Sequence, residues 1–425
     1  MECGDKNRRF GLVRNAGGGY VVNIYVKGEC MMKRIGVVGF GRRIDHVVKN
    51  VVRLGKGEVE VVAYYDPSSK AAARVAVDYP GVRRCDSVEA VVAAADVDWV
   101  FIGSFNAIHS AHAVAALDAG KDVFCEKPVA TTRQQCMDIV AARKRNPSKQ
   151  FIVGFVLRYS AFYRTMKKWI EEGRLGQLIS MEFNETLSPY HGASMHGNWR
   201  RKSQWSGPMI VEKCCHDMDL MLWMTGSHPA RVASFGGLTF FKSENAHYND
   251  LYPVGEKGYR YYDRGLATGY AVGDEENVTP FNDDKDTIDN QVAIMELENG
   301  VRISFHFCMH SAQQERRFYM CGTKGTIRGN VLTGTLEYTP VGWDAQTETT
   351  RPIEGDDHGG AEEPMAQDVL DCMLRDAPPP TTLEDGLRAS FTCFGIEEAR
   401  ETGTVVCMQP YWSDLAQASG SVLRS

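Results

Sequence analysis

The chain has 425 residues, of which 43% are hydrophobic and 24% are charged, and its formal net charge is −6. This length predicts two domains, because a single core rarely grows beyond about 250–300 residues. The negative charge and the absence of a Lys/Arg-rich run argue against nucleic acid as the main partner. No apolar run approaches the roughly 18 residues of a membrane-spanning helix, so no membrane partner is expected.

The first 32 residues differ from the rest of the chain. They are rich in Gly, Asn and charged residues, and their only apolar stretch, Tyr20 to Val26, is interrupted by Asn23. Such a stretch is too short and too broken for a secretory signal. We expect residues 1–32 to be a disordered extension or an upstream reading of the start codon.

Between residues 33 and 155, short apolar runs alternate with helical segments. Strands are expected at 34–38, 59–65, 99–103, 122–125 and 151–155, and helices at 45–54, 68–79, 87–95, 109–119 and 131–144. Strands that are apolar on both faces and alternate with helices indicate a parallel sheet covered on both sides. We therefore predict a doubly wound α/β domain of the Rossmann type over residues 33–155.

From residue 156 to 425 the pattern changes to helices and longer strands. Helices are expected at 163–172, 209–225, 366–374 and 383–400, and strands at 178–186, 231–241, 289–297, 301–309 and 316–321. The turn signal Glu298-Asn299-Gly300 indicates an antiparallel hairpin. The prediction is an α+β domain with a large, mostly antiparallel sheet. Residues 242–286 form a polar insertion that is long enough for a lid, an oligomer arm or a partly disordered segment.

Twelve cysteines are scattered along the chain without a preceding signal peptide. This pattern predicts free, mostly buried thiols and a cytoplasmic location. Cys214-Cys215-His216 could suggest zinc. Adjacent side chains on a helix point about 100° apart, however, and no second Cys/His pair has suitable spacing, so no metal site is expected.

The turn after the first predicted strand carries part of a dinucleotide-binding fingerprint. Gly39 permits the tight turn, and Gly41 lets the backbone approach a pyrophosphate at a helix N-terminus. Ile44 occupies the position of the third small residue. Asp66 ends the next strand, where an acid would bind the adenosine ribose and repel a 2′-phosphate. These residues predict NAD rather than NADP; the alternative is a plain strand–helix turn with a helix-capping Asp.

Two further motifs could carry chemistry. In Glu126-Lys127-Pro128, a lysine follows a predicted strand directly, where it could hydrogen-bond a substrate hydroxyl, or assist proton transfer if its pKa is lowered. On the helix at 209–225, Glu212 and His216 are one turn apart, so the carboxylate could orient the imidazole as a proton acceptor. The alternatives are a surface salt bridge for the lysine and a partly buried polar stripe for the helix.

These motifs resemble those of the Gfo/Idh/MocA oxidoreductases, the group of glucose–fructose oxidoreductase and inositol dehydrogenase, from about residue 33 to the C-terminus. The motifs that agree in order are Gly39-x-Gly41, Asp66, Phe105-Asn106-x-x-His109, Glu126-Lys127-Pro128, Arg158, Glu212-x-x-x-His216-x-x-Asp219, Gly322-Thr323-Lys324-Gly325 and the segment 382–386. Two residues depart from the family pattern, Ile44 in the turn and Glu212 where Asp is commoner. They imply looser helix–strand packing and a differently held substrate.

The resemblance implies a role for each motif. His216 would accept a hydroxyl proton, Lys127 would hydrogen-bond the same oxygen, and Glu212 would orient the substrate or His216. The implied cofactor site comprises Gly39, Gly41, Arg42, Arg43, Asp66, Phe105, Asn106, His109 and Glu126. The implied substrate site comprises Arg158, Trp199, Arg200 and Asp219. The segments 190–192 and 198–201 could contact a sugar or could equally be surface loops.

The expected function is NAD-dependent hydride transfer from a secondary alcohol of a sugar, sugar acid or cyclitol. One alternative is redox-neutral glycoside elimination or epimerisation, in which tightly held NAD oxidises the substrate transiently. A second is a non-catalytic NAD-binding sensor, against which the presence of both Lys127 and His216 argues. The expected partner is a small polyhydroxylated molecule, and the resemblance implies a homodimer or homotetramer. The sequence does not identify the substrate.

Overall fold

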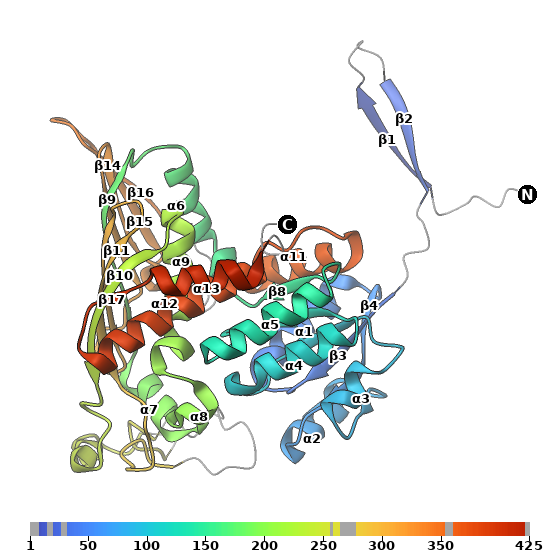
Figure 1. The fold of residues 1–425 in the computed structure, drawn as a ribbon, viewed down its shortest axis with the longest axis horizontal. Coiled ribbons are helices and arrows are strands. Elements are labelled where there is room, and N and C mark those ends of the chain that lie inside the picture. The colour runs from blue at the N-terminus through green and yellow to red at the C-terminus, as the bar shows by residue number, and fades with distance from the viewer. Residues whose placement is uncertain are drawn as a thin grey trace, which may run out of the picture.

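A computed structural model describes residues 8–14, 20–26, 32–255, 258–263, 278–352 and 360–420. Two sheets dominate the fold, one on each side of the molecule, with helices between them (Figure 1). The predicted combination of a doubly wound parallel sheet and a large, mostly antiparallel sheet is confirmed.

The first domain contains a six-stranded sheet in the order β5-β4-β3-β6-β7-β8, in which all paired strands are parallel. Its strands are β3 (Lys33–Val38), β4 (Val59–Tyr65), β5 (Arg83–Arg84), β6 (Trp99–Ile102), β7 (Asp122–Cys125) and β8 (Phe151–Val153). Its helices are α1 (Arg42–Gly55), α2 (Ser69–Asp78), α3 (Val88–Val92), α4 (Asn106–Asp118) and α5 (Arg133–Arg145). Every residue of β6 and β8 is buried, because helices cover both faces of the sheet.

The second domain contains a nine-stranded sheet in the order β16-β15-β14-β13-β9-β12-β11-β10-β17. Within this sheet, β9 and β12 pair in parallel, and the other described neighbours pair antiparallel. The strands are β9 (Leu178–Thr186), β10 (Pro229–Gly237), β11 (Asn290–Leu297), β12 (Arg302–Cys308), β13 (Arg317–Gly322), β14 (Gly325–Asn330), β15 (Thr335–Pro340), β16 (Glu348–Thr350) and β17 (Val406–Cys407). The α-helices between β8 and β10 are α6 (Ala161–Glu171), α7 (Pro189–Gly197), α8 (Ser203–Ser206) and α9 (Met209–Thr225). Short 3₁₀ helices span Val156–Tyr159 (η1), Trp199–Arg201 (η2), Ser243–Leu251 (η3) and Val331–Thr333 (η4).

The C-terminal helices return to the first domain. They are α11 (Glu362–Arg375), α12 (Leu383–Thr402) and α13 (Gln409–Ser419). α11 packs on α1, α13 packs on α5, and α12 contacts β8, β10 and α9. The Thr381 hydroxyl donates to the carbonyl of Val153 at 2.7 Å. The last 60 or so residues therefore belong to both layers, although they follow the second domain in sequence.

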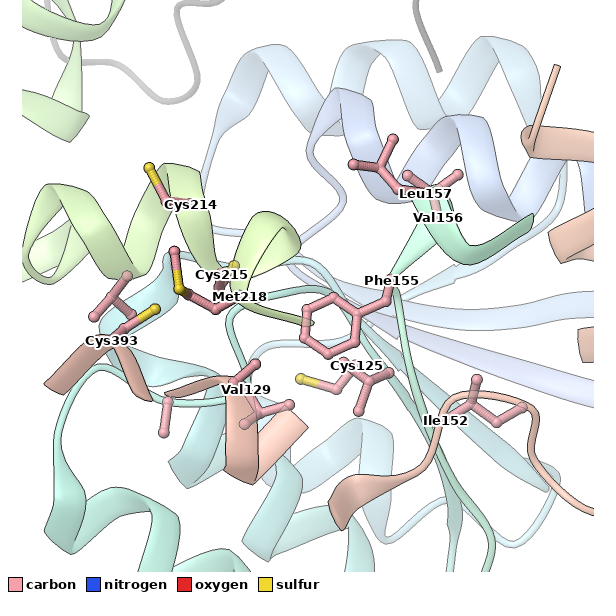
Figure 2. Close-up of a cluster of buried hydrophobic side chains, with 14 of the residues drawn as sticks. Cys125, Val129, Ile152, Phe155, Val156, Leu157, Cys214, Cys215, Met218 and Cys393 are labelled. Carbon is pink, nitrogen blue, oxygen red and sulfur yellow. The ribbon is translucent and has the colours of Figure 1, made fainter. Parts of the chain in front are cut away.

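Figure 2 shows the core where the two domains join. Cys125 and Phe155 from the ends of the parallel sheet lie near Cys215 and Met218 of α9 and Cys393 of α12, and all five side chains are buried. This apolar contact fixes the position of α9 against the parallel sheet, which matters because α9 carries Glu212 and His216.

Part of the predicted N-terminal extension is regular. Residues Arg8–Arg14 (β1) and Tyr20–Val26 (β2) pair as an antiparallel hairpin. The other residues of 1–31 lie outside the described part of the chain, as do residues 256–257 and 264–277 of the insertion. The insertion begins with η3 and returns along residues 278–286.

Three general features concern the described residues only. The ten cysteines among them are free thiols, and seven of these are buried. No group of three or more His, Cys, Asp or Glu side chains in this part of the chain is arranged to hold a metal ion. None of its helices is long and apolar enough to cross a membrane.

Candidate active site

The turn between β3 and α1 is shaped by its glycines. Gly39 has φ = 75°, and a Cβ there would lie 2.4 Å from the backbone of Ser104, so only glycine fits. Gly41 is the N-cap of α1 and supplies no side-chain acceptor for the first amides of that helix. A helix N-terminus without a side-chain cap suits the pyrophosphate of a dinucleotide.

Ile44 at the third fingerprint position does not loosen the packing as expected. It is fully buried, and a Cβ on Gly103 would lie 2.4 Å from the Cβ of Ile44. The small residue needed for close packing is thus on the end of the neighbouring strand β6. Gly103 on the neighbouring strand therefore compensates for the larger Ile44 in the fingerprint.

Asp66 lies at the end of β4 and is buried. It accepts a hydrogen bond from the amide of Ser68 at 2.8 Å. Burial raises the pKa of Asp66, although hydrogen bonds from Ser68 and Phe40 and the charges of Arg74 and Arg84 act in the opposite direction. The acid expected at the adenosine ribose is therefore present, with two arginines close to it.

Glu126 and Arg43, both expected in the cofactor site, pair with each other. Arg43 Nε donates to Glu126 at 2.9 Å, and its Nη1 donates to Glu362 of α11 at 2.5 Å. A Cβ on Gly154 would lie 3.0 Å from the Glu126 carboxylate, so glycine makes room for it. This arrangement joins α1, β7 and α11, and it favours a structural role for Arg43. Arg42 is exposed in the first turn of α1.

Lys127 contacts the first turn of α9. Its Nζ donates to the backbone carbonyl of Glu212 at 2.7 Å and lies 3.4 Å from the Glu212 carboxylate. The lysine side chain is 19% exposed and the glutamate side chain 4%. The lysine and the helix motif, which lie 85 residues apart in sequence, therefore form one cluster.

Glu212 receives donors from three segments. Besides Lys127, the guanidinium of Arg200 forms an ion pair with Oε1, and Asn106 Nδ2 donates to Oε2 at 3.1 Å. Burial opposes ionisation of this carboxyl. The charges of Lys127 and Arg200 and the hydrogen bonds from Arg200 and Asn106 outweigh burial and lower the pKa of Glu212 to about 2. The group is a carboxylate at neutral pH.

Lys127 is a charged donor rather than a base. Burial, the largest single effect, lowers its pKa, but the interactions with Glu212, Cys215 and Glu126 together outweigh burial, and the net effect is a pKa above the ordinary value. Of the two lysine roles considered from the sequence, proton transfer by an amine of lowered pKa is therefore disfavoured. The geometry supports hydrogen bonding to a substrate oxygen.

His216 lies one turn after Glu212 and is buried. Its ring meets Phe155 edge-on, with 5.8 Å between the ring centroids. The four-residue spacing places both side chains on the same side of α9. The Glu212 carboxylate also contacts Lys127, Arg200 and Asn106, so any influence of Glu212 on His216 is shared with these three partners.

An aromatic wall lies beside this cluster. Phe105, at the N-cap of α4, packs against Trp199 with 4.7 Å between ring centroids and against Trp205 with 5.5 Å. The guanidinium of Arg200 lies 4.4 Å from the centre of the Trp199 ring. The two ring nitrogens of His109 lie 2.7 Å from the Pro128 carbonyl and 2.9 Å from the Ser104 carbonyl, so His109 links the segments next to Phe105 and Lys127. Burial lowers the pKa of His109.

Arg158 and Asp219, both expected to bind substrate, form a buried ion pair with each other. Two nitrogens of Arg158 donate to Asp219 at 2.8 and 2.6 Å, and one also donates to Asp385 at 2.9 Å. Despite burial, these two carboxylates raise the pKa of Arg158. The triad joins η1, α9 and α12, so its geometry favours a structural role over substrate contact.

Two residues of these networks were not anticipated: Glu362 and Trp205. Asp385 lies in the segment 382–386 that carries part of the resemblance, but its contact with Arg158 was not predicted. Nothing in the local sequence distinguishes Glu362 from other helix-surface acids. Trp205 in α8 offered a signal, since it is a large aromatic residue six positions after Trp199.

Comparisons with known proteins identify the class. An oxidoreductase family with an NAD-binding Rossmann fold matches residues 33–155, and the C-terminal alpha/beta domain of the same family matches residues 167–408. The chain therefore belongs to the GFO_IDH_MocA oxidoreductase family, and the predictions of an oxidoreductase and of NAD as its cofactor are confirmed.

Individual relatives and solved structures resemble the chain over most of its length. The oxidoreductase YteT of Bacillus subtilis (strain 168) is 25% identical over 381 residues, which are 80% of this chain and 89% of the relative. 1,5-Anhydro-D-fructose reductase of Ensifer adhaerens is 26% identical, covering 88% and 97%. A levoglucosan dehydrogenase in complex with NADH and levoglucosan has a TM-score of 0.72 at 17% identity, covering 89% of this chain and 99% of that one. That likeness concerns the fold.

Proposed function

We propose that the protein is a dehydrogenase that oxidises a secondary alcohol of a sugar, sugar acid or cyclitol with NAD. The observation that carries this proposal is the contact of Lys127 with Glu212 at the start of α9, one turn before His216. Names of relatives agree: an inositol 2-dehydrogenase of Saccharopolyspora erythraea is 33% identical over 195 residues, covering 46% of this chain and 54% of the relative.

Different residues of the chain would bind the cofactor and act on the substrate. Residues 39–41 and the N-terminus of α1 would hold the pyrophosphate, and Asp66 the adenosine ribose. When bound, the nicotinamide supplies the hydride acceptor. Lys127 donates a hydrogen bond to the substrate oxygen, and His216 takes the hydroxyl proton. Glu212 keeps Lys127 charged and in place.

The aromatic wall would limit access of water to the reacting carbon. Phe105, Trp199 and Trp205 come from both domains and pack together, so they close one side of the cluster with apolar surface. Arg200, on the same side, can donate to a substrate hydroxyl or carboxylate while it pairs with Glu212.

A turnover screen tests this proposal. The protein with NAD would be offered myo-inositol, levoglucosan, other polyols, sugar acids and glycosides, and NADH absorbance and product would be followed together. We expect NADH in a one-to-one ratio to oxidised product. Product without net NADH would instead support redox-neutral chemistry, and no turnover of any compound would contradict the dehydrogenase assignment.

We also propose that the protein forms a homo-oligomer through the outer face of the nine-stranded sheet. Phe235, Val292 and Ile294 lie on neighbouring strands there and are 68%, 46% and 63% exposed. Adjacent apolar side chains on an open sheet face favour burial against a second copy. Light scattering after size-exclusion chromatography should give a dimer or tetramer, and a monomer at micromolar concentration would contradict this.

A further inference from the structure

Arg200 lies in a short segment that has few hydrogen bonds of its own. It lies in η2, which has only three residues, between α7 and α8. Within the segment, its amide donates to Asn198 Oδ1 at 2.8 Å. A single short 3₁₀ turn contributes few hydrogen bonds of its own, so its position depends on what packs against it.

The insertion supplies that support through its return arm, which comprises residues 278–286 and the adjoining Thr287. The arm runs along the segment and bonds its backbone at both ends. The amide of Val278 donates to the Gly197 carbonyl at 3.0 Å. The amide of Asp286 and the hydroxyl of Thr287 donate to the Arg201 carbonyl at 3.2 and 3.3 Å.

Two carboxylates of the arm add side-chain contacts. Asp286 accepts from the amide and the hydroxyl of Ser203, both at 2.7 Å. Asp284 accepts from Arg201 Nη2 at 3.2 Å and forms an ion pair with Lys202. Arg201, which is buried, also donates to the Asn198 carbonyl at 3.0 Å, so it links the arm to both ends of η2.

The arm is itself fixed to the second domain. Lys285 Nζ donates to the Phe241 carbonyl at 2.6 Å. Phe281 packs against Phe240 and Phe241, with ring centroids 5.7 and 5.9 Å apart. Asp289, just beyond the arm, accepts from the amides of Thr239 and Phe240 at 2.9 and 2.6 Å. Because the arm is anchored in this way, it can hold η2 at a fixed position relative to the second domain.

We propose that the return arm is a positioning element for the active site, in which Asp286 and Asp284 hold η2 so that Arg200 stays on Glu212. The proposal rests on the function proposed above. Neither aspartate touches the cluster at Lys127, so both are positioning residues. The insertion, which the sequence left open as a lid, an oligomer arm or a disordered segment, would then serve the chemistry through its described part.

Kinetics on the full-length protein test the arm. With a compound that the wild type turns over in the screen, Asp286→Ala should lower kcat/KM about tenfold, while the affinity for NADH stays unchanged. Asp286→Asn, which keeps an acceptor for the Ser203 amide, should restore most of the loss. Asp283→Ala is the matched control, because Asp283 is an exposed acid of the same arm whose charge acts on Lys285 rather than on η2.

A double-mutant cycle with Arg200→Ala shows whether the arm acts through Arg200. If it does, Asp286→Ala costs little further activity once Arg200 is removed, so the two effects are not additive. Additive effects, or an Asp286→Ala variant as active as wild type, would overturn the proposal while the dehydrogenase assignment stands. An Arg200→Ala variant with wild-type kcat/KM would instead contradict the place of Arg200 in the site.

Hydrogen–deuterium exchange of the NAD-loaded protein needs no substrate. Asp286→Ala should increase exchange of the Arg200 and Arg201 amides several-fold, and Asp283→Ala should not. Equal exchange in all three proteins would refute the arm's role even if the screen finds no substrate.

Discussion

The cofactor turn at residues 39–44 and the cluster around Glu212 are built by different means. The turn depends on backbone: Gly39 adopts a positive φ, Gly41 caps a helix, and Gly103 leaves space for Ile44. The cluster depends on side chains that four separate segments bring together. The residues of the turn are consecutive and need only space beside the end of β6, whereas the cluster needs four distant segments in place.

The two regions also differ in charge. Near the turn, one buried acid, Asp66, faces Arg74 and Arg84. In the cluster, Glu212 lies between Lys127 and Arg200 and is held as a carboxylate. Changes in the first region should alter cofactor choice, and changes in the second should alter turnover. The following predictions test that separation.

The largest effect is expected at His216. Removing the proton acceptor with His216→Ala should lower kcat by roughly 10²–10⁴-fold and leave NAD affinity nearly intact. Steady-state kinetics and NADH fluorescence titration would measure the two quantities. His306→Ala, on the exposed outer face of β12, is the control and should turn over like wild type. Wild-type turnover in the His216 variant would remove His216 from the mechanism.

The next largest effect concerns stability rather than turnover. Arg158→Met leaves the buried Asp219 without its cation, so the free energy of unfolding should fall by about 3 kcal/mol. Chemical denaturation would measure it. Arg133→Ala breaks an exposed ion pair with Asp414 and should cost less than about 1 kcal/mol. If Arg158→Met instead raises KM and leaves stability unchanged, the substrate role inferred from resemblance is the better one.

The sequence predicted well what depends on local patterns. The helix at 209–225 and the strands at 59–65 and 178–186 have the predicted bounds, because apolar periodicity and flanking breakers define them. The strands β14 to β16 were missed. β14 contains two glycines, and β16 has three residues without a buried side chain, so neither gives a clear alternating pattern.

The site was predicted in its residue types more than in its contacts. Lys127, Glu212 and Arg200 were all candidates, and the structure brings them together. Arg43 was expected on the cofactor but pairs with Glu362, which lies 319 residues away. Such a pair depends on how α11 returns to α1, and no local pattern encodes that packing.

A smaller effect is expected on cofactor choice. Asp66→Ala should weaken NAD binding about tenfold and relax the discrimination against NADP, because Arg74 and Arg84 then face the 2′-position without the acid. Parallel titrations with NADH and NADPH would give the ratio of dissociation constants. An unchanged ratio would contradict the role of Asp66. A change in kcat with saturating cofactor would contradict the separation between the two regions.

The smallest effect is a shift in pH dependence. The negative charge of Glu212 raises the pKa of Lys127, so Glu212→Gln should lower that pKa and move the alkaline limb of the kcat/KM profile to lower pH by about one unit. The acid limb should not follow Glu212 in the wild type, because its pKa of about 2 lies below the working range. Profiles for both proteins, with the same substrate at low saturation, would show this. An alkaline limb at the wild-type position would mean that a group other than Lys127 controls it. That result would contradict the proposal that the Glu212 carboxylate maintains the charge of Lys127.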